Sequence, residues 1–194
     1  MSQWRSEIAS GHVRVLFLDE CHLVWGDVSG YAWSRRNQRV DVPIASTRER
    51  QTYYGALDYL TKQVVVQEYS AGNEVNTVAF LKYLQSCYDP STRLIIVWDG
   101  VNYHRSAMMQ EFLAQVNAGL SSEQWNITCV RLAPRAPEQN PIEDVWLQAK
   151  QFIRKYARLC HRFWAVKLLF KLATHCQTFT FARAFMYGYC SYPI

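Results

Sequence analysis

Two short apolar runs that each end in an aspartate constrain the fold of this chain more than any other feature. Residues 13–18 read Val-Arg-Val-Leu-Phe-Leu and precede Asp19, and residues 94–98 read Leu-Ile-Ile-Val-Trp and precede Asp99. Apolar runs of this length predict buried strands. If the two strands lie side by side and parallel, both carboxylates emerge at the carboxyl edge of the sheet, where open α/β sheets hold their ligands.

The remaining pattern predicts an α/β domain with a mixed sheet. Strand-like stretches early in the chain give way to alternating helices and strands, which is typical of a sheet flanked by helices. Asn73 predicts the start of a helix whose apolar stripe is Val75, Val78, Leu81 and Leu84. We expect strands within residues 30–42, 51–69 and 127–132, helices over residues 74–88, 106–119 and 141–158, and a further helical region within residues 161–185.

Composition is typical of a globular protein. Of the 194 residues, 49% are apolar and 19% are charged, which argues against disorder. Residues 1–11 contain no apolar stretch and no window holds 18 uncharged apolar residues, so we expect neither a secretory signal nor a membrane span. The six cysteines form no CxxC pair, which predicts reduced thiols and argues against a zinc site. We therefore expect a cytoplasmic protein.

Positive charge is concentrated in one part of the chain. The net charge is +5, whereas residues 131–171 alone hold nine basic and three acidic residues, a net charge of +6. This asymmetry favours a face that meets a polyanion, and the alternative is a solvated helix face. The candidate phosphate contacts are Arg35, Arg36, Arg39, Arg135, Lys150, Arg154 and Lys155. Three aromatic residues are candidates either for stacking on bases or for the core: Trp25, Trp33 and Tyr103.

A third acidic position follows the last predicted strand. Residues 134–146 read Pro-Arg-Ala-Pro-Glu-Gln-Asn-Pro-Ile-Glu-Asp-Val-Trp, which predicts a helix capped by Asn140, with Pro141 first and Glu143 third. Successive helical residues point about 100° apart, so only one of Glu143 and Asp144 faces the sheet edge. Glu143 either joins the two aspartates or merely forms a reciprocal cap with Asn140. Carboxylates gathered without His or Cys ligands favour Mg²⁺ or Mn²⁺.

Three segments together resemble a known family. These are Asp19-Glu20, the segment Trp-Asp-Gly-Val-Asn-Tyr-His at residues 98–104, and Pro-Glu-Gln-Asn-Pro-Ile-Glu at residues 137–143. In order and context they resemble the DDE transposases of the mariner superfamily, especially its bacterial insertion-sequence branch. Residues 30–33 also resemble a family segment, whereas Ser-Arg-Arg-Asn at residues 34–37 departs from the Lys-Gly or Arg-Gly turn common there.

The resemblance implies an RNase H-like, retroviral integrase-like fold with a mixed five-stranded sheet flanked by helices. We expect residues 13–158 to form the catalytic domain, residues 1–12 to be a lead-in, and residues 159–194 to be a helical extension packed on the same domain. The implied catalytic acids are Asp19, Asp99 and Glu143, holding two Mg²⁺ ions, with Mn²⁺ as a substitute. His104 is implied to contact the scissile phosphate or to assist proton transfer. Glu20 is expected to point to the opposite face.

The implied activity is cut-and-paste DNA transposition. The resemblance implies cleavage and strand transfer by in-line phosphoryl transfer on double-stranded DNA, with transposon ends as substrate, a TA dinucleotide as target and a dimer assembled on DNA. Such enzymes recognise their ends through N-terminal helix-turn-helix domains. Because the predicted first strand begins at residue 13, we expect end recognition to lie in a region outside this chain.

Three other functions compete with this interpretation. A related RNase H-like endonuclease would cut DNA without joining it. A catalytically inactive, DNA-binding remnant of a mobile element is the second alternative, and the complete acidic set argues against it. Paired carboxylates also occur in glycosidases, but here they accompany basic residues and no sugar-binding signature.

Overall fold

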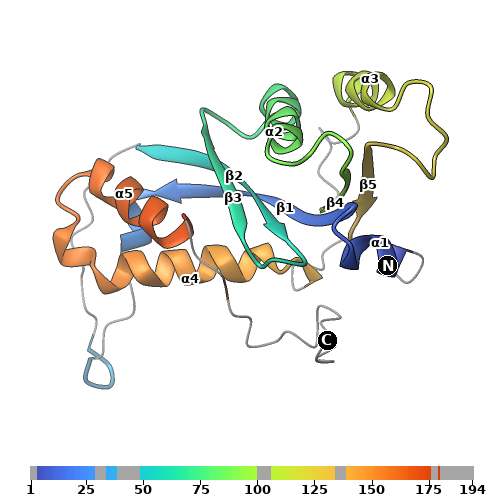
Figure 1. Ribbon diagram of the computed structural model, residues 1–194. Helices are drawn as coiled ribbons and strands as arrows, with labels where there is room; N and C mark the ends of the chain where they lie inside the picture. The colour runs from blue at the N-terminus through green and yellow to red at the C-terminus, as the bar shows by residue number, and fades with distance from the viewer. Residues whose placement is uncertain are drawn as a thin grey trace.

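The computed structural model describes residues 4–28, 34–38, 49–99, 106–133, 139–175 and 179. A five-stranded mixed sheet has the order β3-β2-β1-β4-β5 (Figure 1). β1 pairs antiparallel with β2 and parallel with β4, β2 pairs antiparallel with β3, and β4 pairs parallel with β5. The strands are β1 (Val13–Val24), β2 (Arg50–Asp58), β3 (Val64–Tyr69), β4 (Arg93–Trp98) and β5 (Ile127–Arg131). This confirms the predicted mixed sheet.

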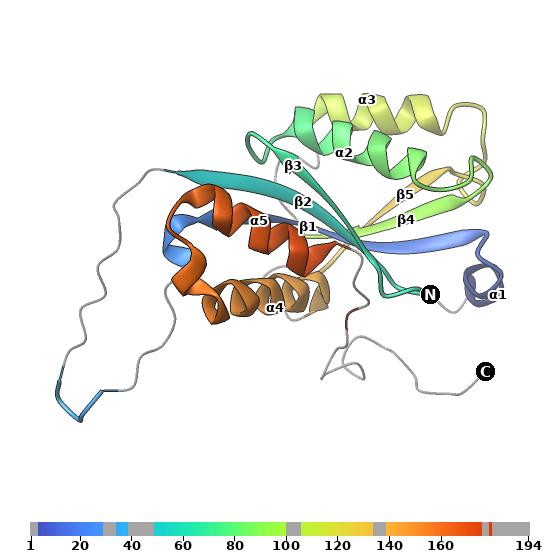
Figure 2. The same cartoon turned by 60° about the vertical axis from the view of Figure 1, so that its left-hand side comes forward.

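Helices cover both faces of the sheet. In Figures 1 and 2, α2 and α3 lie on one face and α4 and α5 lie on the other. The helices are α1 (Arg5–Ala9), α2 (Glu74–Ser86), α3 (Ala107–Val116), α4 (Ile142–Lys155) and α5 (Phe163–Thr174), with one-turn 3₁₀ helices η2 (Trp25–Val28) and η5 (Ala157–Leu159). Because the central strands are buried on both sides, their sequences are apolar without alternation.

β1 is six residues longer than predicted, so Asp19 lies inside the strand and not after it. The parallel pairing with β4 ends at Phe17 and Val97, one residue before the two apolar runs end. The antiparallel pairing with β2 continues to Val24 and Arg50. The backbone of β1 therefore stays extended beyond Asp19 because one neighbour continues to pair with it. A paired strand holds this side chain more rigidly than a position after the end of the strand would.

The predicted helices are confirmed with small changes at their ends. Asn73 caps α2, since its side-chain oxygen accepts a hydrogen bond from the Asn76 N–H at 2.9 Å. Val75 does not join the buried stripe of α2, because its position in the first turn leaves it 55% exposed. Within residues 30–42, only the turn at 34–38 is described. There the Ser34 hydroxyl donates to the Gln38 carbonyl at 2.8 Å, and the remainder of that predicted strand region lies outside the described residues.

The two helical layers bury separate cores. One core joins odd-numbered residues of β1 to α4 and α5, and the other joins Leu16 and Leu18 to α2 and α3. Phe170 of α5 packs at the centre of the first core, with its ring centroid 4.5 Å from that of Tyr53 and 5.8 Å from that of Trp146. Helix α5 thus shares the core of α4 and the sheet.

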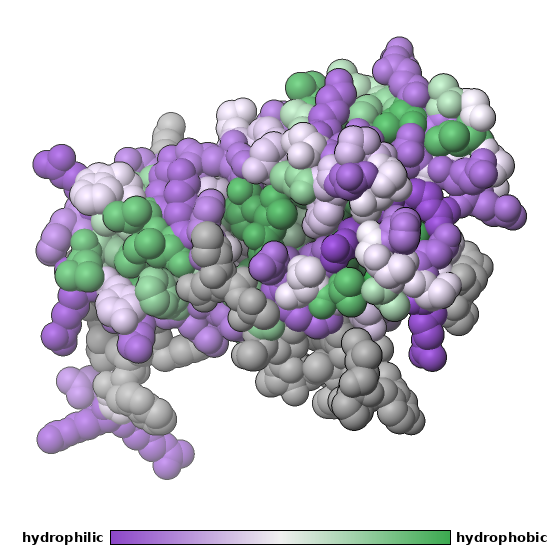
Figure 3. All heavy atoms as spheres, in the orientation of Figure 1, coloured by the Kyte–Doolittle hydropathy of each residue, from purple (hydrophilic) through white to green (hydrophobic). Residues whose placement is uncertain are grey.

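The outer face of α5 is apolar as well. Trp164, Leu168 and Leu172 repeat every four residues and are exposed, and Figure 3 shows apolar side chains at the surface over this helix. On the flank of α5, the Lys171 ammonium lies 3.0 Å from the Glu68 carboxylate, which links the helix to the edge strand β3. Within the described residues, no helix is both long enough and apolar enough to cross a membrane.

Gly55 allows α4 to lie close to the sheet. Gly55 is the residue of β2 opposite Asp19, and the indole of Trp146 lies directly over it. A Cβ atom at residue 55 would be 2.3 Å from Cη2 of Trp146 and 3.1 Å from Cδ1 of Ile142. Both of those side chains are fully packed in the core, so neither can move away without cost.

We expect Gly55→Ala to destabilise the fold by about 1–3 kcal/mol, the usual cost of adding a methyl group to a filled core. Gly26→Ala is the matched control, because a Cβ there meets nothing within 4 Å. Denaturant unfolding followed by circular dichroism measures both free energies. Equal unfolding free energies for the two variants would contradict the close packing of α4 on β2.

Candidate active site

Asp19 of β1 and Asp99, which directly follows β4, come from neighbouring parallel strands. The β1–β4 ladder pairs each β1 residue with the residue 80 positions later, from Val13 with Arg93 to Phe17 with Val97. The observed pairing stops there, and two further steps in the same register would bring Asp19 level with Asp99. Phe17 and Val97 both belong to the core under α4. Because side chains alternate along a strand, the two aspartates are on the face that α4 covers.

Glu143 comes from the first turn of α4. The helix begins at Ile142 after Pro141, one residue later than predicted, and the Glu143 N–H donates to the Asn140 carbonyl at 3.1 Å. Glu143 is exposed and Asp144 is half-buried. The first turn therefore brings two further carboxylates to the edge where β1 and β4 carry theirs.

The interpretation of Asn140 as the side-chain cap of α4 is wrong. Its amide nitrogen donates to the Leu18 carbonyl at 3.2 Å, just beyond the last β1–β4 pair, and no side-chain hydrogen bond caps the helix. Asn140 is only 4% exposed. A buried amide bonded in this way fastens the start of α4 to the strand beside Asp19. The reciprocal cap between Asn140 and Glu143 is therefore not formed.

Glu143 interacts electrostatically with each of the two aspartates. Burial raises the pKa of Asp19 well above its usual value, and the negative charges of Glu143 and Glu20 raise it further. The hydrogen bond from the Trp146 indole opposes this increase. Although the Glu143 side chain is exposed in part, the protein around its carboxylate displaces water and raises its pKa. Asp99 and Asp144 raise this pKa further, and Lys150 acts in the opposite direction. Glu143 thus interacts with both aspartates.

The donor set suits a hard divalent cation. All three acids offer carboxylate oxygens, which are the ligands that Mg²⁺ and Mn²⁺ prefer. As the side chains stand in the described ranges, no three His, Cys, Asp or Glu residues are close enough together to hold one metal ion among them. Burial is the main cause of both raised pKa values, and repulsion between Glu143 and the aspartates adds to it. A dication bound by these acids would relieve that repulsion.

Glu20 lies on the other face of the sheet, as expected. It is opposite Tyr54 in the β1–β2 ladder, and its charge acts on that phenol, whose pKa burial raises to about 12. Tyr54 belongs to the core under α2 and α3. Glu20 therefore acts on Asp19 through its charge and its backbone N–H, while its side chain lies on the other face.

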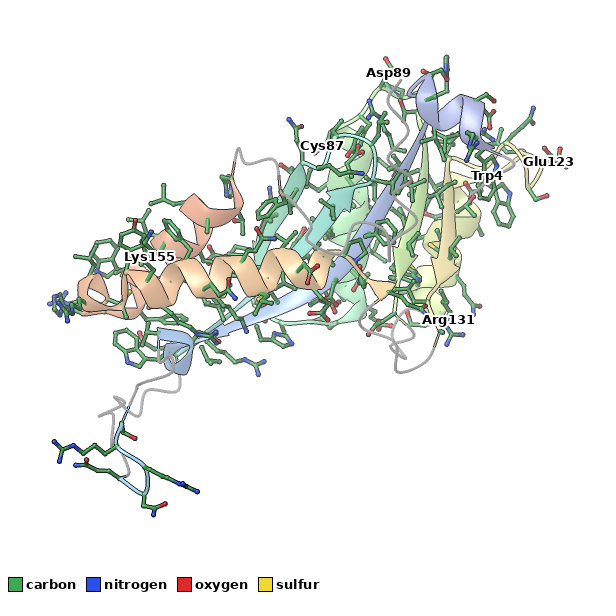
Figure 4. The ribbon with its side chains drawn as sticks, turned by 90° about the horizontal axis from the view of Figure 1, so that it is seen from below. Trp4, Cys87, Asp89, Glu123, Arg131 and Lys155 are labelled. Carbon is green, nitrogen blue, oxygen red and sulfur yellow. The ribbon has the colours of Figure 1, made fainter. Side chains whose placement is uncertain are left out.

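The predicted basic residues divide into distinct groups. Lys150 pairs with the buried Asp27 at 3.2 Å, Arg154 is half-buried, and Lys155 is exposed at the end of α4 (Figure 4). Arg35 and Arg36 are exposed on the turn at residues 34–38, which projects away from the sheet in Figures 1 and 2.

The other candidates from the sequence lie outside the described residues, except for Trp25. Those outside are Arg39, Arg135, His104, Trp33 and Tyr103. Trp25 packs into the core, with its ring centroid 6.3 Å from that of Phe163.

Sequence reasoning did not assign a role to Trp146. Its indole N–H donates to Oδ2 of Asp19 at 3.0 Å, so it is the closest polar partner that α4 gives this acid. The signal was present in the spacing, because Trp146 follows Glu143 by three residues and so shares its helix face. Gly55 gave no comparable signal, since only strand register places it beneath the indole.

Comparisons with known proteins agree with this architecture. Residues 14–162 match the family described as DDE superfamily endonuclease. The fold is similar to a chain of the simian T-cell lymphotropic virus intasome, with a TM-score of 0.57 and 12% identity over 95% of this chain and 56% of that chain. Comparison with curated proteins gives no match.

Two solved structures of Mos1 transposase show the same likeness. The paired-end complex with the left transposon end matches with a TM-score of 0.57 and 12% identity, over 96% of this chain and 53% of that chain. The catalytic domain with raltegravir and Mn matches with a TM-score of 0.55 and 12% identity, over 91% of this chain and 76% of that chain. At such identities the likeness shows the RNase H-like fold. The chain spans little more than half the length of the intasome chain and of the paired-end transposase.

The raised pKa of Asp19 predicts how stability depends on pH without metal. A folded-state pKa above the unfolded value means that stability falls as pH rises above about 3.9, by at most about 1.4 kcal/mol per pH unit, until the folded-state pKa is passed. Asp19→Asn removes this loss. We expect the Tm of Asp19→Asn minus that of the wild type to grow as pH rises from 4, in thermal unfolding with EDTA. A difference that does not change with pH would show that Asp19 ionises without cost.

Proposed function

Because the chain belongs to the DDE superfamily endonucleases, we propose that it is the catalytic domain of a DNA transposase, which cuts DNA and joins the cut end to a target by metal-dependent phosphoryl transfer. One observation carries the proposal. Carboxylates come from β1, from the residue after β4 and from the first turn of α4, and Glu143 interacts electrostatically with both Asp19 and Asp99.

The three acids are mounted on rigid elements, which in-line displacement requires. Asp19 lies inside a strand paired with β2, Asp99 directly follows β4, and Glu143 is in a helix that Asn140 fastens to β1. These residues would hold Mg²⁺ or Mn²⁺, two ions by family resemblance, which would activate the attacking oxygen and stabilise the leaving oxygen. The protein's contribution is to mount the three carboxylates on rigid elements despite their repulsion.

Helix α4 offers a track for DNA that starts at the acids. Its 14 residues span about 21 Å, which matches about six phosphates along one strand of a duplex. Figure 4 shows Arg131 near the start of α4 and Lys155 at its end. Lys150 lies between them and lowers the pKa of Glu143, while its bond to Asp27 fixes its position. We assign Arg131, Arg154 and Lys155 to contacts with the DNA backbone.

The remaining features of the reaction follow from family resemblance. Arg35, Arg36, Arg39 and Arg135 are further candidates for phosphate contacts, and His104 is a candidate contact to the scissile phosphate. We propose that the enzyme acts as a dimer on transposon ends, inserts at TA, and relies for end recognition on a helix-turn-helix region outside this chain.

Glu143→Gln tests the third acid. Gln keeps the size and polarity of Glu but is a poor ligand for a hard dication. We expect DNA cleavage in Mg²⁺ to fall by more than the roughly 10–100-fold that loss of an outer-shell partner costs, with Tm retained. Asp19→Asn and Asp99→Asn should do the same. The neighbouring change Asp144→Asn is the control and should remain active.

Two assays decide this assignment. Cleavage of supercoiled DNA by Glu143→Gln at the wild-type rate would overturn it, and so would inactive Asp144→Asn beside active Glu143→Gln. Strand transfer from pre-cleaved ends separates a transposase from an endonuclease that does not join. Cleavage without joining would identify the latter.

Binding to DNA should depend on salt and not on sequence. Because affinity comes from counterion release, the logarithm of the association constant should fall linearly with the logarithm of salt concentration. We expect Lys155→Ala to reduce the magnitude of that slope by about 1 in fluorescence anisotropy with random duplexes. Lys82→Ala on α2 is the matched control, because Lys82 is exposed on the other helical layer and, like Lys155, packs near an aromatic ring. Equal slopes for the two variants would contradict the track along α4.

A further inference from the structure

We propose that Trp146 is a positioning residue, whose indole N–H holds the carboxylate of Asp19 in the orientation that binds a divalent cation. This inference rests on the proposed function, since it concerns how one of its three acids is set. The observation behind it is the bond from Nε1 of Trp146 to Oδ2 of Asp19 at 3.0 Å. Trp146 is 4% exposed and so lies beneath the site and away from solvent and substrate.

Packing restricts the indole to one orientation. Gly55 lies directly under the ring, and a single added Cβ would collide with it. Phe170 stacks on Trp146 at an interplanar angle of 24°. A ring held between a strand backbone and a second aromatic ring cannot rotate freely. The N–H therefore points to one place, the carboxylate on the neighbouring strand.

A neutral donor is the appropriate partner for a carboxylate that must bind a cation. A lysine bonded to Asp19 would cancel the negative charge that attracts the metal ion. Lys150 lies one helical turn beyond Trp146, but Asp27 holds its ammonium at 3.2 Å, and the backbone N–H of Val24 in turn binds Asp27 at 2.8 Å. The helix thus presents a neutral donor to Asp19 and directs its nearest cation elsewhere.

The indole bond leaves Asp19 with room for a ligand. A carboxylate has two oxygens and about four acceptor positions, and the Trp146 indole and the backbone N–H of Glu20 occupy two of them. Partners of this kind orient metal-binding carboxylates and typically contribute 10–100-fold to metal affinity or activity. Trp146 therefore acts on the metal site through Asp19 without touching either metal or DNA.

Trp146→Phe tests the inference, since it removes the N–H and keeps an aromatic ring against Phe170. Titration calorimetry with Mn²⁺ on the metal-free protein, without DNA, should show a Kd raised by about 10–100-fold. In DNA cleavage, kcat should fall while KM for DNA stays unchanged, because the buried ring does not meet DNA. Trp164→Phe is the matched control, because Trp164 is 63% exposed on α5, and it should match the wild type in both measurements.

The outcomes separate this inference from the proposed function. Unchanged Mn²⁺ affinity and kcat in folded Trp146→Phe, beside inactive Asp19→Asn, overturn the positioning role alone. A wild-type protein that does not bind Mn²⁺ overturns both. A rise in KM for DNA with unchanged kcat also overturns the positioning role of Trp146, since that pattern indicates a DNA contact.

A measurement on protein with an intact Trp146 covers the case in which Trp146→Phe does not fold. In nitrogen-15 NMR, the indole N–H resonance of Trp146 should shift when Mg²⁺ is added to the wild type. In Asp19→Asn the side-chain oxygen can still accept the bond, so the resonance should persist but no longer respond to Mg²⁺. An indole resonance that ignores Mg²⁺ in the wild type overturns the inference.

Discussion

The seating of α4 on the centre of the sheet is the contact on which the rest of this structure depends. Trp146 reaches the backbone of β2 only because residue 55 has no side chain, and the start of the helix is bonded to β1 through Asn140. That contact buries the core between α4, α5 and the sheet. The same contact fixes the position of α4 along the strands and its rotation about its own axis. Glu143 is thereby placed where it interacts electrostatically with the two aspartates. One packing interaction therefore serves both stability and the arrangement of the acids.

The same arrangement concentrates unfavourable charge. Asp19 is largely removed from water and is repelled by the negative charges of Glu143 and Glu20. Asp99 and Asp144 repel Glu143 in the same way. Such repulsion costs folding free energy and persists only when the surrounding fold holds the groups in place. The side chain of α4 that hydrogen-bonds to Asp19 is neutral, the indole of Trp146. Further along α4, Lys150 forms an ion pair with Asp27. This distribution keeps the edge negative while neutralising the next turn of the helix.

Much of the fold and of the candidate site could be predicted from the sequence, for local reasons. The apolar runs of β1 and β4 are visible because both faces of these strands are buried, and Asn73 marks the start of α2 because it caps that helix within the local chain. The errors arose where distant partners decide. β1 continues past its apolar run because β2 pairs with it. The Asn140 side chain bonds to Leu18, 122 positions earlier in the chain, and does not cap the helix that follows it.

Spacing and polarity are local properties of the chain, so the sequence alone shows which residues are acidic, which runs become strands, and that Glu143 and Trp146 share one face of a helix. Three features depend on contacts that the sequence does not reveal: β1 and β4 pair in the register that joins Phe17 to Val97, the indole of Trp146 bonds to Asp19, and Gly55 makes room for that indole. Strand register and helix seating are set by contacts between segments far apart in the chain. Their energies depend on shape and distance in three dimensions, which a linear pattern of residues does not contain.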